Sequence, residues 1–302
     1  MWASLNDKNV DLQHYMDHSD VYDRVAEVSE FKDEVLEIFR QRKEGYYGDA
    51  FLWNAKLKFR KGEITSWCGV NGHGKSLVMG QVALDLLNQG KKVFIASLEM
   101  PPADTIARMA RQFTWSEFPT EKQLDDMFAW REDYLYLFNF VGSINRNKVI
   151  ALCRYAQKIG CDHVIIDSLM KCTGDDDDYG VQKGIVNDLC EVAKEVGIHV
   201  HLICHSRKQK DVKAMIDIND IFGSSAIQNL SHNIVLIHRN ITKEQETEAR
   251  GIPDNTVPDQ IIGLRKQRNG EIQYMDVELW FDRKSQSFST DFGVMPDKYL
   301  NN

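Results

Sequence analysis

The sequence predicts a three-layer α/β domain, in which helices flank a mostly parallel central sheet. Short apolar runs alternate with helical patterns from about residue 60 onwards. A glycine-rich loop at residues 69–76 stands between a strand-like and a helix-like segment. Near the C-terminal end, Asn269-Gly270 is a hairpin signal between two further strands. We therefore expect C-terminal antiparallel strands and an N-terminal helical extension.

Composition bounds the class of protein. The chain has 302 residues, 43% of them hydrophobic and 27% charged, which is typical of a globular domain with an extension. We see no signal peptide and no apolar run long enough to cross a bilayer, so we expect a cytoplasmic protein without a membrane partner. Six scattered cysteines are typical of reduced thiols. A net charge of -8 excludes an overall basic surface, but a cleft can still concentrate a few lysines for nucleic acid.

An amphipathic helix is expected at residues 20–43, with Ser19 as its N-cap and residues 45–48 as its stop. It belongs to an N-terminal extension over residues 1–50, followed by the main domain at 51–290 and a tail at 291–302. The apolar stripe of the helix can dock on its own domain or on a neighbouring subunit, and amphipathicity alone does not choose between them.

The remaining elements follow in order. Residues 76–90 indicate a helix ending at Gly90, and a helical region covers roughly 101–132. Apolar runs of the kind found in buried parallel strands occur at 62–68, 92–98, 161–169, 198–206 and 233–239. Residues 260–282 indicate the two strands of the hairpin.

The loop at 69–76 matches the phosphate-binding pattern G-x-x-x-x-G-K-[ST]. Its glycines let backbone N–H groups surround phosphates, Lys75 reaches the β and γ oxygens, and Ser76 offers a hydroxyl to Mg²⁺. The sequence therefore predicts binding of ATP or another nucleoside triphosphate, with Mg²⁺. The predicted nucleotide-binding residues of the loop are Gly69, Val70, Asn71, Gly72, His73, Gly74, Lys75 and Ser76. His73 receives no individual role, because almost any residue is allowed at its position.

Two carboxylates end neighbouring apolar segments. Asp167 closes the run 163–167 and is the candidate second ligand of Mg²⁺. Glu99 follows the strand at 92–98 and is the candidate group that orients or deprotonates water, because strand ends of this kind face the ligand. The alternative for Glu99 is an exposed residue capping the helix that begins near Pro101.

With these sites in order, the chain resembles the RecA-like ATPase domain of hexameric replicative DNA helicases. This is the DnaB-like family, together with the helicase halves of phage primase–helicases. The resemblance runs from about Lys61 to about Asp282. It rests on GVNGHGKS (69–76), SLEM (97–100), VIIDSL (164–169), LICHSRK (202–208), GSSAIQNLSHNIVLIHRN (223–240) and LRKQRNG (264–270). It implies an ATP-dependent DNA helicase, a ring-forming motor that moves on single-stranded DNA and unwinds duplex.

Several residue roles follow from the resemblance. Glu99 would activate water, while Asp167 and Ser76 would hold Mg²⁺. His205 would sense the γ-phosphate. Lys266 and Arg268 would reach into the ATP site of a neighbouring subunit, and Arg239 with Phe281 would enclose the adenine. The residues alone also allow Arg268 to be a surface arginine beside a turn. They allow His199, His201 and His205 to form a metal cluster, although packing is the better interpretation of histidines on a buried strand.

Contacts with nucleic acid are expected in the segment after His205. The resemblance places it at the central pore, and four cations there can follow a phosphate backbone without reading bases. These are Arg207, Lys208, Lys210 and Lys213. A solvated charged loop is the alternative.

Some residues depart from the family pattern. Aspartates at 175–178 would repel a strand in the other pore loop, leaving Lys183 as a contact there. Phe222 and the pair Gln228-Asn229 replace residues that are often basic or Arg-Gln.

The implied partners are single-stranded or forked DNA, other copies of the chain in a ring expected to be a hexamer, and a primase and polymerase of the same replisome. About sixty residues precede the motor, too few for a primase domain. Two other functions stay open. One is a RecA-type strand-binding filament or loader, and the other is a regulatory ATPase ring that binds protein.

Overall fold

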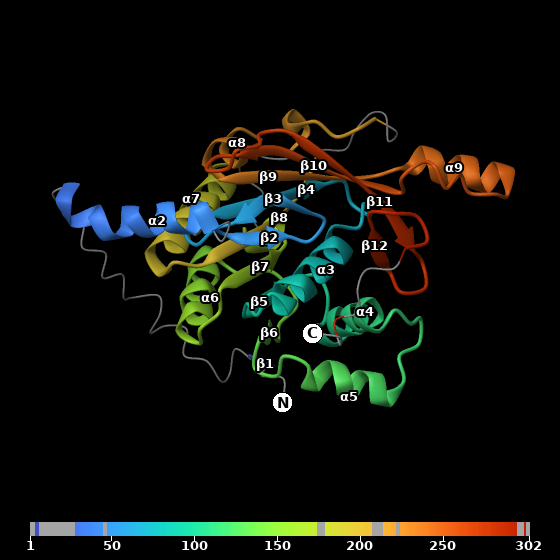
Figure 1. Ribbon diagram of the computed structural model, residues 1–302, viewed down its shortest axis with the longest axis horizontal. Coiled ribbons are helices and arrows are strands. Elements are labelled where there is room, and N and C mark those ends of the chain that lie inside the picture. The colour runs from blue at the N-terminus through green and yellow to red at the C-terminus, as the bar shows by residue number, and fades with distance from the viewer. Residues whose placement is uncertain are drawn as a thin grey trace.

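The computed structural model describes residues 4–5, 28–44, 47–173, 179–206, 214–221, 224–294 and 299 (Figure 1). Its strands are β1 (Ser4–Leu5), β2 (Asp49–Phe51), β3 (Asn54–Phe59), β4 (Ile64–Gly69), β5 (Val93–Ser97), β6 (Leu135–Phe138), β7 (His163–Asp167), β8 (His199–His205), β9 (Asn233–Arg239), β10 (Gln260–Gln267), β11 (Met275–Asp282) and β12 (Ser287–Ser289). Its α-helices are α2 (Lys32–Glu44), α3 (Lys75–Asn88), α4 (Pro102–Thr114), α5 (Glu121–Ala129), α6 (Arg146–Lys158), α7 (Tyr179–Val196), α8 (Ser224–Leu230) and α9 (Ile241–Arg250). Short 3-10 helices cover Val28–Phe31, Leu169–Cys172 and Ile218–Asp220.

One large sheet organises the molecule, with the strand order β1-β6-β5-β7-β8-β4-β9-β10-β11-β12. The strands from β1 to β9 in this order pair in parallel, and β10, β11 and β12 pair antiparallel. The predicted parallel sheet with C-terminal antiparallel strands is confirmed. The hairpin β2–β3 forms a separate two-stranded sheet that the sequence analysis did not identify.

Helices cover both faces of the sheet. The central strands β4, β5 and β7 are buried along their whole length, so the side chains on both of their faces need to be covered. On one face α6 and α7 pack over residues such as Val164 and Leu202. On the other face α3 and α4 pack over residues such as Trp67 and Ile203. The predicted helical region at 101–132 contains two helices. Trp115 ends α4 in a left-handed conformation (φ 61°), and Thr120 begins α5 with a capping box.

Three buried histidines, His163, His199 and His201, lie in the N-terminal parts of β7 and β8, away from the phosphate loop. The indole of Trp67 donates to Nδ1 of His201 (3.2 Å), and Nε2 of His201 lies 3.1 Å from Nδ1 of His163. Nε2 of His163 in turn lies 3.1 Å from a carboxylate oxygen of Asp49. His199 contacts the Thr65 hydroxyl and the Arg60 carbonyl. No group of His, Cys, Asp or Glu suited to a metal ion occurs among the described residues, which agrees with packed histidines.

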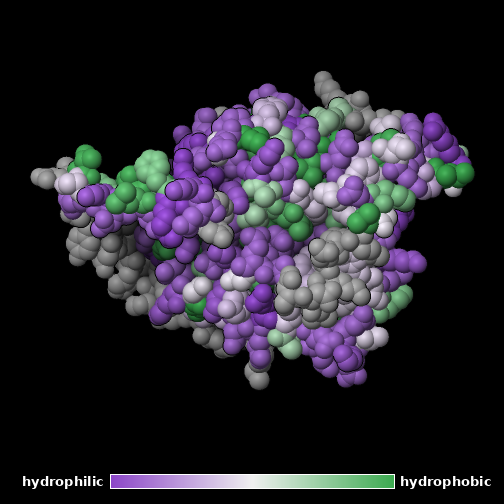
Figure 2. Space-filling model, in the orientation of Figure 1, coloured by the Kyte–Doolittle hydropathy of each residue, from purple (hydrophilic) through white to green (hydrophobic). Residues whose placement is uncertain are grey.

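Helix α2 projects from the body of the molecule (Figure 1), and none of its residues is buried. Its described part begins with the 3-10 helix at Val28, so residues 20–27 of the predicted helix lie outside the described residues. Large apolar side chains on this segment face solvent, among them Val28, Phe31, Val35, Leu36 and Phe39. Figure 2 shows them as hydrophobic colour on the projecting helix. Within the part of the chain that the structure describes, no helix is long and apolar enough to cross a membrane.

Candidate nucleotide site

The phosphate loop joins β4 to α3. Gly72 and Gly74 have positive φ values of 81° and 78°, which glycine adopts without strain. Gly69 lies so close to β9 that an added Cβ would sit 2.8 Å from the carbonyl of Ile237. The ammonium group of Lys75 donates to the carbonyls of Gly69 (2.9 Å) and Val70 (3.1 Å). The loop is thus shaped by its glycines, with Lys75 folded over it.

The predicted ligands of Mg²⁺ lie side by side. The Ser76 hydroxyl donates to a carboxylate oxygen of Asp167 over 2.6 Å. Burial raises the pKa of Asp167. A hydroxyl and a carboxylate at the mouth of a phosphate loop are the oxygen donors that Mg²⁺ takes together with the phosphates of a nucleotide. The two residues therefore fit this ion.

Glu99, Ser168 and His205 form a hydrogen-bonded group beside the loop. The Ser168 hydroxyl donates to a carboxylate oxygen of Glu99 (2.6 Å), and His205 Nε2 lies 3.2 Å from that hydroxyl and 3.4 Å from the carboxylate. The hydrogen bond to His205 lowers the pKa of Glu99 to about 2, so its carboxylate is charged at neutral pH. A fixed, charged carboxylate of this kind can orient a water molecule.

Strand register explains why these residues meet. Gly69 lies opposite His205 on the neighbouring strand, and Ser97, two residues before Glu99, lies opposite Asp167. Because the carboxyl ends of parallel strands meet at one edge of a sheet, β4, β5, β7 and β8 deliver all four functions to the same place. The predicted set of Lys75, Ser76, Glu99, Asp167 and His205 is brought together here and lines one cavity of about 860 Å³.

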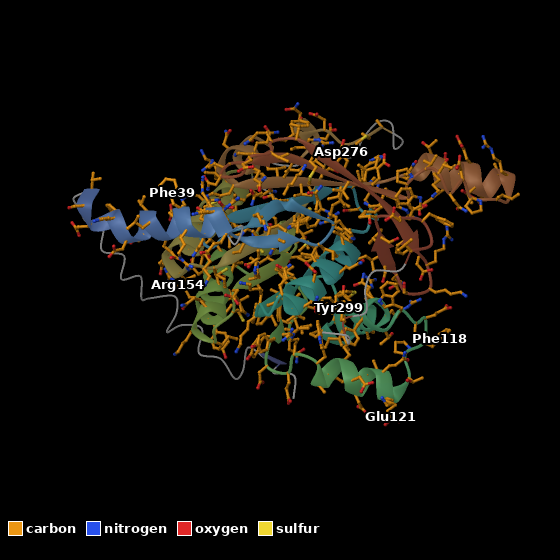
Figure 3. The ribbon with its side chains drawn as sticks, viewed as in Figure 1. Phe39, Phe118, Glu121, Arg154, Asp276 and Tyr299 are labelled. Carbon is orange, nitrogen blue, oxygen red and sulfur yellow. The ribbon has the colours of Figure 1, made fainter. Side chains whose placement is uncertain are left out.

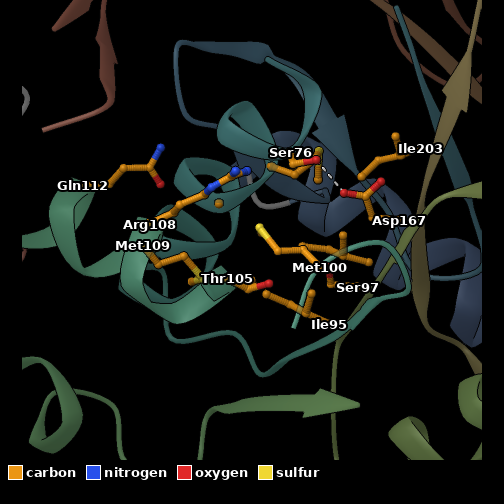
Figure 4. Close-up of a pocket in the computed structure, with 13 residues that line it drawn as sticks. Ser76, Ile95, Ser97, Met100, Thr105, Arg108, Met109, Gln112, Asp167 and Ile203 are labelled. Carbon is orange, nitrogen blue, oxygen red and sulfur yellow. Dashed lines mark hydrogen bonds between the residues drawn. The ribbon is translucent and has the colours of Figure 1, made fainter. Parts of the chain in front are cut away.

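Two cations in this cavity were missed by the sequence analysis, namely Arg108 and Lys171. Arg108 lies on α4, on the same face as Thr105, Met109 and Gln112. These four residues also line a small buried cavity of about 30 Å³ behind Ser76 and Asp167. Figure 4 shows the Arg108 side chain extending toward Ser76. The spacing 105, 108, 109, 112 is helical and places the four residues on one helix face, but it does not indicate that this face lines the nucleotide cavity.

His73 acquires a structural role that its position in the motif did not indicate. It is buried, its Nδ1 accepts the backbone N–H of Arg239 (3.3 Å), and its carbonyl accepts the side-chain amide of Gln260 (3.1 Å). Burial lowers the pKa of His73 to about 4, so the ring is neutral and can accept. The loop is therefore fastened to the end of β9 and the start of β10.

The residues expected around the adenine lie near the loop, in different surroundings. The Arg239 guanidinium donates to the carbonyl of Gly72 (3.2 Å) and pairs with Glu244. The ring of Phe281 packs on Phe288 at 4.9 Å between centroids and lines a separate cavity of about 180 Å³. Phe288 in turn lies beside Gly74.

Lys266 and Arg268 are not part of this cavity. β10 runs antiparallel to β9, so Gln260 pairs with Arg239 near the phosphate loop while Gln267 pairs with Asn233 at the opposite edge. There the Lys266 ammonium donates to the carbonyl of Gln228, and Arg268 donates to the carbonyl of Asn229 (2.8 Å).

The predicted nucleic-acid contacts Arg207, Lys208, Lys210 and Lys213 lie outside the described residues, as do Phe222 and the aspartates at 175–178. Lys183 is exposed on α7.

Together, the parallel sheet, the phosphate loop and the two carboxylates define a RecA-like P-loop nucleoside triphosphatase. A family model described as an AAA domain matches residues 50–211, more than half of the chain. The chain belongs to this family, and it is an enzyme that uses a nucleotide.

The chain is also similar to a curated phage protein and to solved structures. It is 25% identical over 242 residues to a DNA helicase/primase of Enterobacteria phage T3, covering 72% of this chain and 41% of that protein. The chain thus spans about two fifths of the length of this relative. Among solved structures, one described as an ATPase domain matches with a TM-score of 0.68 and 16% identity, over 85% of this chain and 97% of that one.

A DnaB-like replicative helicase, solved in a study of its interactions with primase, matches with a TM-score of 0.65 and 17% identity, over 88% of this chain and 67% of that one. These structures share the fold of this chain. The predicted RecA-like fold is confirmed.

Proposed function

We propose that the chain is an ATP-dependent DNA helicase that works as a ring, moving on single-stranded DNA and unwinding duplex in the cytoplasm of a bacterial or phage-infected cell. One observation supports this above the others. The two halves of the expected catalytic site lie at opposite ends of the strands of one sheet. Lys75, Glu99 and Asp167 lie at the carboxyl ends of the parallel strands, and Lys266 and Arg268 lie at the other end. A complete site therefore needs two chains.

The separation is too large for one chain to close. Six residue steps divide Asn233 from Arg239 along β9, and a strand advances about 3.3 Å per residue, which gives roughly 20 Å. An arginine side chain does not span this distance. Arg268, together with Lys266, acts in the proposal on the nucleotide of the next subunit, where an arginine stabilises charge developing on the transferred phosphoryl group.

Within one chain, the residues divide the work of hydrolysis. Ser76 and Asp167 would hold Mg²⁺, which would supply positive charge beside the phosphates. Lys75 leaves the carbonyls of its own loop and turns to the β and γ oxygens of ATP. Glu99 orients the attacking water, and His205 couples the group around Glu99 to the segment that begins at residue 207. Arg239 and Phe281 border the nucleobase.

Ring assembly has a candidate contact in α2. Its apolar residues are exposed on a helix that projects from its own domain. Docking on a neighbouring subunit is therefore favoured over packing on its own domain. A helix given to the next subunit makes a head-to-tail contact, which closes into a ring when repeated. A hexamer is the size we propose.

The nucleic-acid partner is proposed to be single-stranded or forked DNA, bound by Arg207, Lys208, Lys210 and Lys213. Primase and polymerase of the same replisome are proposed as protein partners. The support is that the phage relative is a DNA helicase/primase and that the similar DnaB-like structure comes from a study of its interactions with primase.

The deciding experiment is strand release from forked DNA by the purified chain with ATP and Mg²⁺. The proposal expects release that stops when a non-hydrolysable nucleotide replaces ATP. Hydrolysis stimulated by single-stranded DNA without release would instead support a RecA-type filament or loader. Hydrolysis indifferent to DNA would support a regulatory ring that binds protein.

A further inference from the structure

A basic groove lies near the amino end of β4, whereas the nucleotide site lies at the carboxyl end of the same strand. It has a volume of about 470 Å³, and its lining includes Arg42, Tyr47, Lys56, Lys58, Arg60 and Glu271. Arg60 precedes β4, whereas the phosphate loop follows the other end of the same strand, so the groove is separate from the nucleotide cavity. Four cations face one carboxylate here, on a chain whose net charge is -8.

The cations form a row because of the pleat of β3. Leu57 and Phe59 are fully buried in the core, so Lys56, Lys58 and Arg60 share the other face. Residues two apart on a strand are separated by about 6.6–6.8 Å. Phosphates along an extended single strand of nucleic acid repeat at a comparable spacing, which suits one cation to each phosphate.

Arg60 has buried hydrogen-bond donors from which an anion could accept. It is only 9% exposed, and its Nε and Nη1 have no hydrogen-bond partner among the described residues. Nη1 lies 3.7 Å from the Glu63 carboxylate, which offsets charge without completing a hydrogen bond. Buried donors left without a partner are costly, so an anion entering the groove would be stabilised.

Tyr47 positions this arginine and a second one. The guanidinium carbon of Arg60 lies 5.0 Å from the centre of its ring, and that of Arg42 lies 4.8 Å from it. These are cation–π distances. The ring is therefore engaged by two guanidinium groups instead of being free to stack on a base.

We propose that the basic groove binds the phosphate backbone of a single nucleic-acid strand, as a second contact beyond the segment 207–213. The proposal rests on the proposed function for its ligand. A row of cations with no free aromatic face gives binding that is independent of sequence and sensitive to salt. The alternative occupant is an acidic protein helix, such as the exposed helix α9 of another copy. It fits less well, because Glu244 and Glu246 of α9 already pair with Arg239 and Arg250 of their own chain.

The first test is the double variant Lys56→Glu with Lys58→Glu in the full chain. Binding of a fluorescent single-stranded oligonucleotide of mixed sequence is measured by anisotropy over a salt series, with a non-hydrolysable nucleotide present. Each lost phosphate contact flattens the plot of log affinity against log salt by about 0.7, so we expect weaker binding and a slope flatter by about 1.4.

The matched control is Lys122→Glu with Lys284→Glu. Both lysines are exposed and far along the chain from β3, and the change in net charge is the same. The control should keep the slope of the unmodified chain. Equal weakening in both variants would mean a general effect of charge and would overturn the groove as a site.

A second test locates the strand directly. Ala55 is exposed and lines the groove, and all six native cysteines are buried, so Ala55→Cys can be labelled selectively with a photo-crosslinker. We expect crosslinks to the oligonucleotide from Ala55→Cys and none from Phe118→Cys, which is 80% exposed elsewhere. No crosslink at position 55, with loss of assembly in the lysine variant by light scattering, would make the groove a contact between copies and overturn the proposal.

The outcomes separate this proposal from the proposed function. Crosslinking and an altered slope without ATP-driven strand release in the unmodified chain would support the groove and refute the helicase. Strand release with an unchanged slope and no crosslink would refute the groove alone.

Discussion

The residues of the nucleotide site are held by different kinds of hydrogen-bond partner. Lys75 rests on carbonyls of its own loop, His73 on two strands far along the chain, and Glu99 on Ser168 and His205. The Ser76–Asp167 hydrogen bond joins the two oxygens proposed for Mg²⁺. Binding a nucleotide with its ion would therefore exchange these hydrogen bonds of Lys75 and of the Ser76–Asp167 pair for new ones.

Glu99→Gln tests the proposed role of the carboxylate. The amide is similar in shape but cannot take a proton or carry charge, so turnover should fall by about 10²–10⁴-fold while nucleotide binding stays near that of the unmodified chain. Phosphate release and nucleotide titration measure the two quantities. Glu121→Gln on α5 is the control, because that residue is exposed and outside the cavity. Turnover preserved within about twofold would contradict the role.

Buried histidines predict how stability depends on pH. Burial lowers the pKa of His199 to about 3 and the pKa of His73 and His232 to about 4, whereas an unfolded histidine titrates near 6.5. Between these values the unfolded chain binds more protons, so the free energy of unfolding should fall as pH drops from about 7 to about 4. Asp85, whose pKa burial raises to about 6, and Asp167, whose pKa burial also raises, work in the opposite direction, whereas burial lowers the pKa of His201 and His238 as it does for the three histidines named above.

Urea unfolding at about pH 7 and about pH 5 measures this decline. His199→Gln removes one of the three groups and should make the decline shallower, whatever it does to stability at neutral pH. A free energy of unfolding that stayed constant over this interval would contradict the prediction.

At the scale of elements, the sequence predicted best what local pattern determines. The strands β4, β5, β7, β8 and β9 are apolar runs, and their shared edge follows from parallel pairing, so Glu99, Asp167 and His205 could be placed together. The hairpin β2–β3 escaped because its strands are short and mix buried with exposed positions.

Contacts between distant segments could not be predicted from local pattern. Gln260, 187 residues away from His73, gives that residue its role, and Arg108 enters the cavity only through the packing of α4 on α3. The direction of β10 is a further example, since it places Arg268 at the far edge. The hairpin signal predicted two antiparallel strands but not which edge their ends would reach.

Arg268→Ala tests the position of that arginine. Because Arg268 lies far from its own phosphate loop, the variant should bind nucleotide normally and lose turnover in the assembled protein. Lys75→Ala should lose turnover for a different reason, since its own loop is damaged. Phosphate release by each variant alone and by their mixtures is the measurement.

Mixing separates action across a boundary from action within one chain. An Arg268→Ala subunit keeps an intact phosphate loop, which a Lys75→Ala neighbour can complete with its arginine. Partial recovery of turnover in the mixture is therefore expected. Mixtures no more active than the separate variants would place the arginine in its own site or remove it from catalysis.

At the scale of the whole molecule, α2 and α9 project from opposite ends of the body (Figure 1). Figure 3 shows Phe39 on α2, clear of the domain. A helix whose apolar residues are exposed at this level is typical of an interaction site. Helix α2 is therefore the contact that we propose for assembly.

Phe31→Ser with Phe39→Ser should abolish assembly without unfolding the domain. The two rings are 45% and 64% exposed, so their loss costs the folded chain little apolar burial but removes area from the proposed contact. Light scattering measures the assembly, and circular dichroism measures the fold. Phe118→Ser, on the far side of the body in Figure 3, is the control. Assembly unchanged by the double variant would exclude α2 as the connecting element.

The fastening of His73 to the start of β10 has a consequence for order among subunits. β10 begins at Gln260, which holds the phosphate loop, and ends at Gln267, beside the arginine proposed to serve the next nucleotide. In the proposed ring, every nucleotide would then be linked to the following one by a single continuous strand. This linkage has a direction, because each β10 runs from the phosphate loop to the arginine of its own chain, and that arginine serves the nucleotide of the next subunit. ATP hydrolysis would then pass around the ring in one direction. The Gln260→Ala variant would keep each site able to hydrolyse ATP but would lose the order of hydrolysis among subunits.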